Sequence, residues 1–194
     1  EHAREVTVPI DKNRNNLDKY GVEKCEEEEQ KMLKEDGRAR TFRGLTARLN
    51  YLGQDRTDIQ YAVKELSRKM SCPDEDDWGK LKKVARYLKG AHRFRTIYKY
   101  QEKPEGIEVW TDSDFAGCQK SRKSTSGGVI RHGGHIIKSW STNQAVIALS
   151  SGEAEYYALV KGVSGAIGIT NLCKDMGTIM EGPIRAKTDA SAAI

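Results

Sequence analysis

Cysteine is scarce in this sequence of 194 residues, and its four cysteines lie far apart. None of Cys25, Cys72, Cys118 and Cys173 forms a CxxC pair, and no histidine spacing completes a zinc site. This pattern indicates free thiols in a reducing compartment rather than a metal cluster built on cysteines.

Long apolar runs are also missing. The longest apolar stretch is far too short to cross a bilayer. The first residues do not resemble a signal peptide, which needs a basic start followed by an apolar run. We therefore expect no membrane partner. Because the chain does not begin with Met, we also expect a segment of a longer protein.

Neither sign of charge dominates, since the formal net charge is only +5. This mild basic excess is compatible with a polyanion partner but does not demand one. The charges are unevenly placed. An acidic run covers residues 26–29, whereas basic residues crowd the stretch 80–99 and recur at Lys120, Arg122 and Lys123. Each cluster taken alone is also compatible with an ordinary solvated surface.

The residue pattern divides the chain into three regions. Residues 1–40 are polar and highly charged, which predicts a linker or a weakly ordered segment. Residues 41–105 carry apolar residues at helical spacing and predict a small helical unit. One helix contains Phe42, Leu45, Leu49 and Leu52, a second follows Asp58 as its N-cap, and a third begins after Pro73 and ends near Gly90.

Residues 106–194 change to the period of β-strands. A first strand leads from Ile107 into Asp112, and two more, over 126–131 and 135–140, are joined by a turn at Gly133–Gly134. A long helix over about 151–176, a strand over 184–188 and a helix starting at 190 follow. The predicted fold is therefore α/β (α+β), with a three-stranded antiparallel meander, one parallel strand and a helix packed on the sheet.

Three acidic residues occupy informative places in this pattern. Asp112 ends the first strand, Glu155 lies in the first turns of the long helix, and Asp189 ends the last strand. In a mixed sheet with a helix on one face, these positions can converge. Converging carboxylates repel one another, and a bound cation relieves the repulsion. The ordinary alternative is a turn residue at a strand end and an acid placed by the helix dipole.

Two ordered sets of segments carry a family pattern: 111–117, 122–127, 137–141 with Gln144, 148–156 and 188–192 in the strand region, and 42–52, 56–59 and 86–90 upstream. The first set resembles the ribonuclease H domain of copia-type retrotransposon polyproteins. The upstream set resembles the end of the reverse transcriptase region and the connector in the same polyproteins, although Thr57 stands where that family usually has Pro. The resemblance therefore covers about residues 41–194.

The resemblance implies a role for each acid. Asp112 would bridge two Mg²⁺ ions, for which Mn²⁺ could substitute. Glu155 would bind one ion and help to orient the RNA 2′-hydroxyl, and Asp189 would hold the ion that positions the attacking water. Asp114 is implied as an auxiliary metal ligand or substrate contact, and Glu153 is a close rival of Glu155.

The resemblance also implies a metal-dependent endonuclease that hydrolyses the RNA strand of RNA–DNA hybrids. The phosphates would be gripped by Lys120, Arg122, Lys123 and Ser124, and the rest of the Pol polyprotein would be a partner. We expect an intracellular location, in the cytoplasm, the nucleus or virus-like particles.

The family pattern is incomplete in this chain. Its fourth acid and last strand would lie beyond Ile194, so a ribonuclease H-like domain would be C-terminally truncated here. No Tyr-x-Asp-Asp motif occurs, so DNA synthesis is not expected. Three alternatives stay open: a non-catalytic nucleic-acid-binding remnant, a DNA-cutting metal nuclease such as an integrase or Holliday-junction resolvase, and a purely structural domain.

Overall fold

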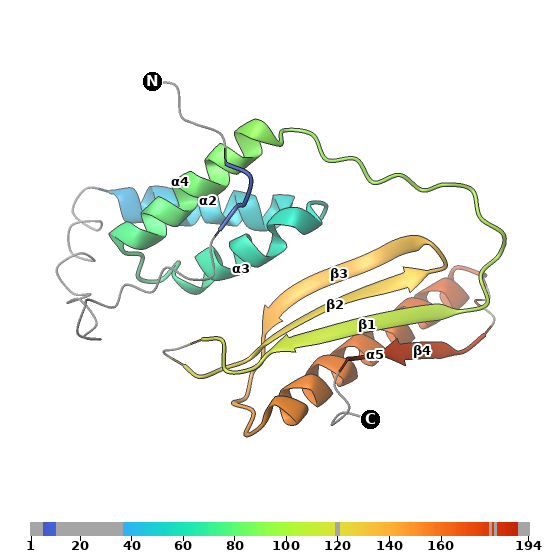
Figure 1. The fold of residues 1–194 in the computed structure, drawn as a ribbon. Coiled ribbons are helices and arrows are strands. Elements are labelled where there is room, and N and C mark those ends of the chain that lie inside the picture. Colours follow the sequence, from blue (N-terminus) through green and yellow to red (C-terminus); the bar gives the residue numbers. More distant parts are fainter. Residues whose placement is uncertain (1–5, 11–36, 119–120, 179, 181, 190–194) are drawn as a thin grey trace. The chain divides into compact units, whose positions relative to one another are not determined.

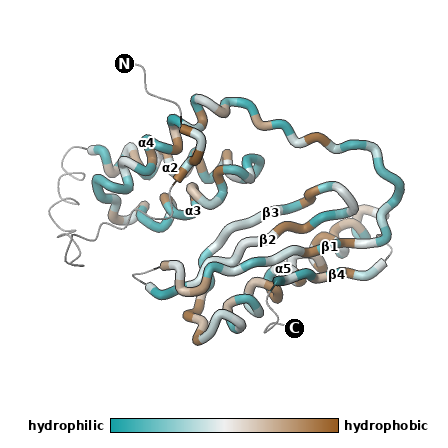
Figure 2. Tube along the Cα trace, viewed as in Figure 1, coloured by the Kyte–Doolittle hydropathy of each residue, from teal (hydrophilic) through white to brown (hydrophobic). Residues whose placement is uncertain are grey.

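The computed structural model describes residues 6–10, 37–118, 121–178, 180 and 182–189, and it divides into two units, Glu1–Arg95 and Thr96–Ile194 (Figure 1). The helices of the first unit are mainly hydrophilic, whereas hydrophobic stretches recur in the strands and helix of the second (Figure 2). No helix in the described part of the chain combines the length and the apolar character that a membrane span requires.

In the part of the first unit that the structure describes, three α-helices and a short 3-10 turn are present, as the helical spacing predicts. Helix α2 begins inside the region predicted as a linker. The buried core joins Phe42, Leu66 and Val84 from the three helices, whereas Leu45 and Leu52, predicted in the same stripe as Phe42, stay 38% and 37% exposed. The elements are α2 (Arg38–Leu52), η1 (Thr57–Ile59), α3 (Gln60–Arg68) and α4 (Glu75–Gly90).

Acidic residues near the helix starts play two different roles. The Asp74 carboxylate accepts from Asp77 N at 2.8 Å and the Asp77 carboxylate accepts from Asp74 N at 3.2 Å, which is a capping box on α4. The prediction that Asp58 is an N-cap is wrong. Its carboxylate accepts from Arg56 Nε at 2.9 Å and from the Tyr87 hydroxyl at 2.8 Å. The bond from this buried guanidinium holds the pKa of Asp58 below its usual range.

The described residues of the second unit form a four-stranded mixed sheet with one long helix across one face (Figure 1). The strand order is β3-β2-β1-β4, in which β1 pairs antiparallel with β2 and parallel with β4. The predicted antiparallel meander, parallel strand and packed helix are therefore confirmed, and the predicted helix start at 190 lies outside the described residues. The elements are β1 (Ile107–Asp114), β2 (Thr125–His132), β3 (His135–Asn143), α5 (Ser151–Asp175) and β4 (Ile184–Lys187).

Helix α5 packs closely on β1 at one glycine. Side chains alternate along a strand, so Ile107, Val109 and Thr111 share the buried face of β1. A Cβ at Gly162 would lie 2.6 Å from Val109 Cγ1 and 2.7 Å from Thr111 Cγ2. Gly162 is therefore a position of close packing between the helix and the sheet. Such packing is absent at Gly168, where a Cβ would meet nothing within 4 Å.

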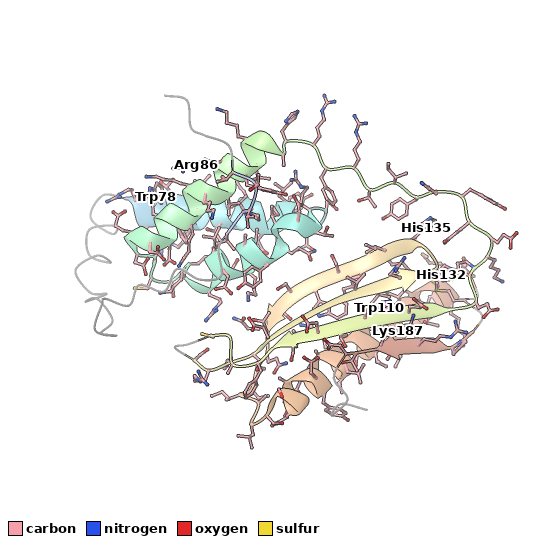
Figure 3. All side chains as sticks on the ribbon, in the orientation of Figure 1. Trp78, Arg86, Trp110, His132, His135 and Lys187 are labelled. Atoms are coloured by element: carbon pink, nitrogen blue, oxygen red, sulfur yellow. The ribbon has the colours of Figure 1, made fainter. Side chains whose placement is uncertain are left out.

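The segment between α4 and β1 contains neither helix nor strand, and residues 92–100 are all exposed. Its end is fastened to the β2–β3 hairpin by Gln101, whose Nε2 donates to His132 O at 3.0 Å and whose Oε1 accepts from Gly134 N at 2.7 Å. His132 and His135 both lie at this hairpin end of the sheet (Figure 3). Their ring nitrogens contact backbone oxygens, His132 at Gly106 and His135 at Lys99, which accounts for them without a metal.

The two helical glycines provide a matched pair of stability predictions. Gly162→Ala should destabilise the protein, because forcing a methyl group into the buried side chains of β1 costs about 1–3 kcal/mol and outweighs the gain in helix propensity. Gly168→Ala should stabilise it by up to about 1 kcal/mol, because only the propensity gain applies. Urea unfolding of both variants measures the difference, and equal effects would contradict the close contact at Gly162.

The buried capping box predicts a pH dependence. Burial, and then the charge of Asp74, raises the pKa of Asp77 to about 6 from its usual 3.8. Because the folded state holds this proton more tightly, the stabilisation is full below about pH 4 and is lost as the pH rises through about 6. Asp77→Asn keeps an oxygen for the Asp74 amide but does not titrate. Relative to this variant, the parent should lose stability between pH 4 and pH 7, as measured by urea midpoints at the two pH values.

Candidate metal centre

Three carboxylates from distant parts of the sequence meet at one edge of the sheet. Asp112 lies near the end of β1, Glu155 lies near the start of α5, and Asp189 follows β4. Each offers one oxygen, and these oxygens all lie within 4.8 Å of one another. The structure therefore brings together the three acids that the sequence singled out, at a separation that one or two cations could bridge.

The pairing of β1 with β4 explains why Asp112 and Asp189 meet. The two strands are parallel neighbours in the register Trp110 to Lys187, so both chains leave the sheet at the same edge. Lys187 also joins the two strands on the face of the sheet opposite α5. Its Nζ donates to Glu108 at 2.9 Å and lies 4.4 Å from the centre of the Trp110 ring (Figure 3).

Glu155 is the buried member of the trio, with only 7% of its surface exposed. Its Oε1 accepts two hydrogen bonds from Ser113, one from the backbone N at 3.0 Å and one from the hydroxyl at 2.7 Å. Its Oε2 is buried and has no hydrogen-bond partner. Leaving a buried carboxylate oxygen unpaired is costly, and a divalent cation would remove that cost. The residues therefore fit a metal ion.

The other two acids suit a partly hydrated ion. Asp112 and Asp189 are both exposed, so a cation held between them and Glu155 would keep access to solvent. Magnesium prefers oxygen ligands and retains several of its waters. A trio of carboxylates with one buried and two exposed members matches that preference.

Glu153 differs from these three acids because it makes hydrogen bonds at the start of α5. Its Oε2 accepts from Leu149 N at 2.7 Å, and its Oε1 accepts from the Tyr157 hydroxyl at 3.0 Å. Its own N–H donates to the hydroxyl of Ser150, the N-cap residue. With both carboxylate oxygens engaged in this way, Glu153 is a helix-start residue. The geometry favours Glu155 over it.

Asp114 lies two residues beyond Asp112 and is exposed on β1. The group within ligand distance at this edge of the sheet consists, among the described residues, of Asp112, Glu155 and Asp189, and Asp114 is not one of them. The chain instead folds back over Asp114: a Cβ at Gly117 would lie 2.4 Å from its Oδ2. An auxiliary ligand role for Asp114 stays a prediction.

The loop between β1 and β2 presents the basic residues predicted to grip phosphates. Arg122 is exposed with a left-handed φ of 54°, and Lys123 is half-buried. Lys120 lies outside the described residues. Ser124 is fully buried, and its hydroxyl accepts from Ala116 N at 3.0 Å. The Ser124 side chain therefore holds the loop together from within and is not presented to a ligand in solution.

A second acidic group, Asp74, Asp76 and Asp77, belongs to the start of α4. Its members are engaged by the capping box and by lysines: Lys69 contacts Asp74 and Lys80 contacts Asp76. This group is explained by helix capping.

Sequence reasoning gave no role to Ser113. Its partner Glu155 is 42 positions away, so no local spacing links the two residues. Its position between Asp112 and Asp114 near the end of a strand is the sequence feature that could have indicated its role. A hydroxyl at that position is a hydrogen-bond donor beside the converging carboxylates.

Curated proteins similar to this chain include a plant mitochondrial protein and transposon polyproteins. The uncharacterized mitochondrial protein AtMg00810 of Arabidopsis thaliana is 40% identical over 119 residues, which are 61% of this chain and 49% of that protein. The retrovirus-related Pol polyprotein from transposon RE2 of the same plant is 33% identical over 142 residues, 73% of this chain and 10% of the polyprotein. The secreted RxLR effector protein 161 of Plasmopara viticola is 34% identical over 115 residues, 59% of this chain and 80% of the effector.

This chain thus spans about half of the mitochondrial protein and about a tenth of the transposon polyprotein. No protein-family model matches the sequence. No solved structure matches it either. For the mitochondrial protein and the polyprotein, the similarity is therefore one of sequence to part of a longer protein.

The unpaired oxygen of Glu155 leads to a binding prediction. Mg²⁺ or Mn²⁺ should bind to the parent and raise its melting temperature, because a ligand that binds only the folded state stabilises it. Asp112→Asn and Glu155→Gln should each abolish most of the rise while the fold is retained. Asp175→Asn, which removes one negative charge at the far end of α5, is the matched control and should leave the rise intact. An equal loss in all three variants would mean that the ion responds to net charge alone.

Proposed function

We propose that the chain is a segment of a copia-type retrotransposon Pol polyprotein, of the kind represented by the retrovirus-related Pol polyproteins to which it is similar, and that its second unit is the ribonuclease H-type endonuclease segment of such a polyprotein. The substrate would be the RNA strand of an RNA–DNA hybrid, and the fold would be ribonuclease H-like. The observation that carries this proposal is the meeting of Asp112, Glu155 and Asp189 within 4.8 Å, with one buried oxygen of Glu155 left unpaired.

The proposed chemistry assigns a task to each side chain. Asp112, Glu155 and Asp189 would hold two Mg²⁺ ions, which supply an activated water and stabilise the departing oxygen of a phosphodiester. Ser113 holds Glu155 in place through its N–H and its hydroxyl. Because Asp112 and Asp189 are exposed, the scissile phosphate of a long duplex could approach them without any opening of the fold.

The proposed substrate also suits the loop between β1 and β2. Hybrid duplexes are recognised by shape, through phosphates and 2′-hydroxyls, and not by reading bases. Arg122 is exposed on a loop that begins directly after the strand of Asp112, and Lys123 follows it. Two cations at this position would contact the phosphate backbone beside the proposed point of cleavage.

Cleavage of a labelled RNA–DNA hybrid tests the proposed activity. The parent should cut the RNA strand only when Mg²⁺ or Mn²⁺ is present, and Asp112→Asn should lower the rate by about 100-fold or more, because several kcal/mol of transition-state stabilisation are lost. Asp175→Asn should cut at the parental rate. Cutting of duplex DNA in place of the hybrid would support the alternative of an integrase or resolvase-type nuclease.

The non-catalytic alternative makes a different prediction for the same materials. Hybrid binding without cleavage by the parent, at any divalent-ion concentration, would favour a nucleic-acid-binding remnant of the polyprotein. Neither binding nor cleavage would leave the purely structural domain as the explanation.

The phosphate grip predicts a salt dependence. Each of Arg122→Ala and Lys123→Ala should weaken hybrid binding and reduce the slope of log K against log salt by about one, because one phosphate contact is lost. Lys174→Ala, near the last turn of α5, should leave the slope unchanged. Fluorescence anisotropy between about 50 and 200 mM salt measures both quantities. A parental slope close to zero would exclude a phosphate-dominated grip.

A further inference from the structure

Gln144 lies just after β3 and is almost completely buried, with 8% of its surface exposed. Its side-chain Nε2 donates to Ser126 Oγ at 2.9 Å and to the backbone oxygen of Ala154 at 2.8 Å. Its backbone N–H donates to Ser124 O at 2.8 Å. One glutamine therefore joins β2, the loop after β3 and the first turns of α5.

These contacts converge on Glu155 from two directions. Ser126 stands opposite Ser113 in the antiparallel ladder of β1 and β2, and Ser113 holds the Glu155 carboxylate. Ala154, whose carbonyl Gln144 holds, is the residue directly before Glu155. Glu155 is thus held at two points. Strand β1 holds its side chain through Ser113, and strand β2 holds the peptide before it through Ser126 and Gln144.

The chemistry of the amide group fixes its orientation. Both Nε2 hydrogens have acceptors, so turning the amide over would place Oε1 against the carbonyl of Ala154, where two acceptors would face each other. In the orientation observed, Oε1 is buried without a hydrogen-bond partner. Leaving this oxygen unpaired has a cost. The observed orientation leaves Oε1 unpaired, but both Nε2 hydrogens stay bonded, one to β2 and one to α5.

We propose that Gln144 is a positioning residue for the metal centre: by tying the carbonyl of Ala154 to Ser126 on β2, it holds Glu155 at the depth where its buried Oε2 can contact a divalent cation. This inference rests on the metal binding of the proposed function. Partners of this kind, which orient a ligand without touching the metal, typically change metal affinity by 10–100-fold when they are removed.

Isothermal titration calorimetry with Mn²⁺ and with Mg²⁺ tests the proposal without any measurement of activity. Gln144→Ala should weaken ion binding by about tenfold or more. Gln144→Glu keeps the shape but, when ionised, donates to neither acceptor, and it should weaken binding as well. Ser126→Ala removes one acceptor while Gln144 still reaches Ala154, so a smaller loss is expected. It supplies the test if the Gln144 variants fail to fold.

Gln101→Ala is the matched control. Gln101 also uses its side-chain amide to tie a loop to the sheet, through His132 O and Gly134 N, but it does so at the hairpin end, where β1 begins. Its loss should lower the melting temperature while leaving ion affinity unchanged. This separates positioning of the acids from general stabilisation.

The outcomes are distinct. Parental ion affinity in folded Gln144→Ala, or in Ser126→Ala if the Gln144 variants do not fold, overturns the role of Gln144 and leaves the proposed function standing. An equal loss of affinity in Gln101→Ala also overturns it, because stability alone would then explain the effect. Absence of ion binding in the parent removes the proposed function and this inference together.

Discussion

The parallel pairing of β1 with β4 is the constraint on which the acidic cluster depends. Two carboxylates about 5 Å apart repel each other by on the order of 3 kcal/mol at an effective dielectric constant of 20. No attraction between the acids themselves brings Asp112 and Asp189 together. The backbone hydrogen bonds between β1 and β4, together with the ion pair of Lys187 and Glu108, hold the two acids close to each other. The third acid, Glu155, lies on α5, which packs on β1.

That helix is placed by steric contact as much as by hydrogen bonds. Gly162 lets the backbone of α5 come down onto Val109 and Thr111, and this sets the height of the helix above the sheet. Ser113 and Gln144 act about two turns earlier, at Glu155 and at Ala154, and set where the helix begins relative to β1. A buried carboxylate with one satisfied and one unsatisfied oxygen results from these restraints acting together.

Local sequence patterns foresaw the elements of the second unit well. Alternation along β1, the glycine pair at the hairpin turn and the acids near the ends of β1 and β4 are all short-range signals, and the antiparallel meander followed from the first two. In the first unit, sequence patterns predicted the helices but assigned the wrong role to Asp58. Asp58 has the chemistry of an N-cap, but the guanidinium of Arg56 and the hydroxyl of Tyr87 compete for its carboxylate. Tyr87 is contributed by α4, which local sequence cannot foresee.

The same limit explains what sequence reasoning missed at the candidate site. A serine that follows Arg122 and Lys123 has the chemistry of a phosphate contact. In the fold, however, the loop closes so that the Ser124 hydroxyl points inward and accepts from Ala116 N. Ser113 and Gln144 acquire their importance only from residues brought to them by the tertiary fold. The pattern of strand ends and a helix start indicated that Asp112, Glu155 and Asp189 could converge, and the family resemblance selected Glu155 over Glu153. The pattern could not predict the neutral residues that hold them.

The exposed stretch 92–100 has a practical consequence for the chain. It contains Arg93, Arg95 and Lys99 in a segment with neither helix nor strand, immediately before the point where Gln101 fastens the backbone to the hairpin. Proteolytic enzymes that cut after basic residues act preferentially at exposed segments of this kind, outside helices and strands. Brief digestion with trypsin therefore offers a way to separate the helical unit from the sheet unit and to obtain the acidic site on a smaller polypeptide.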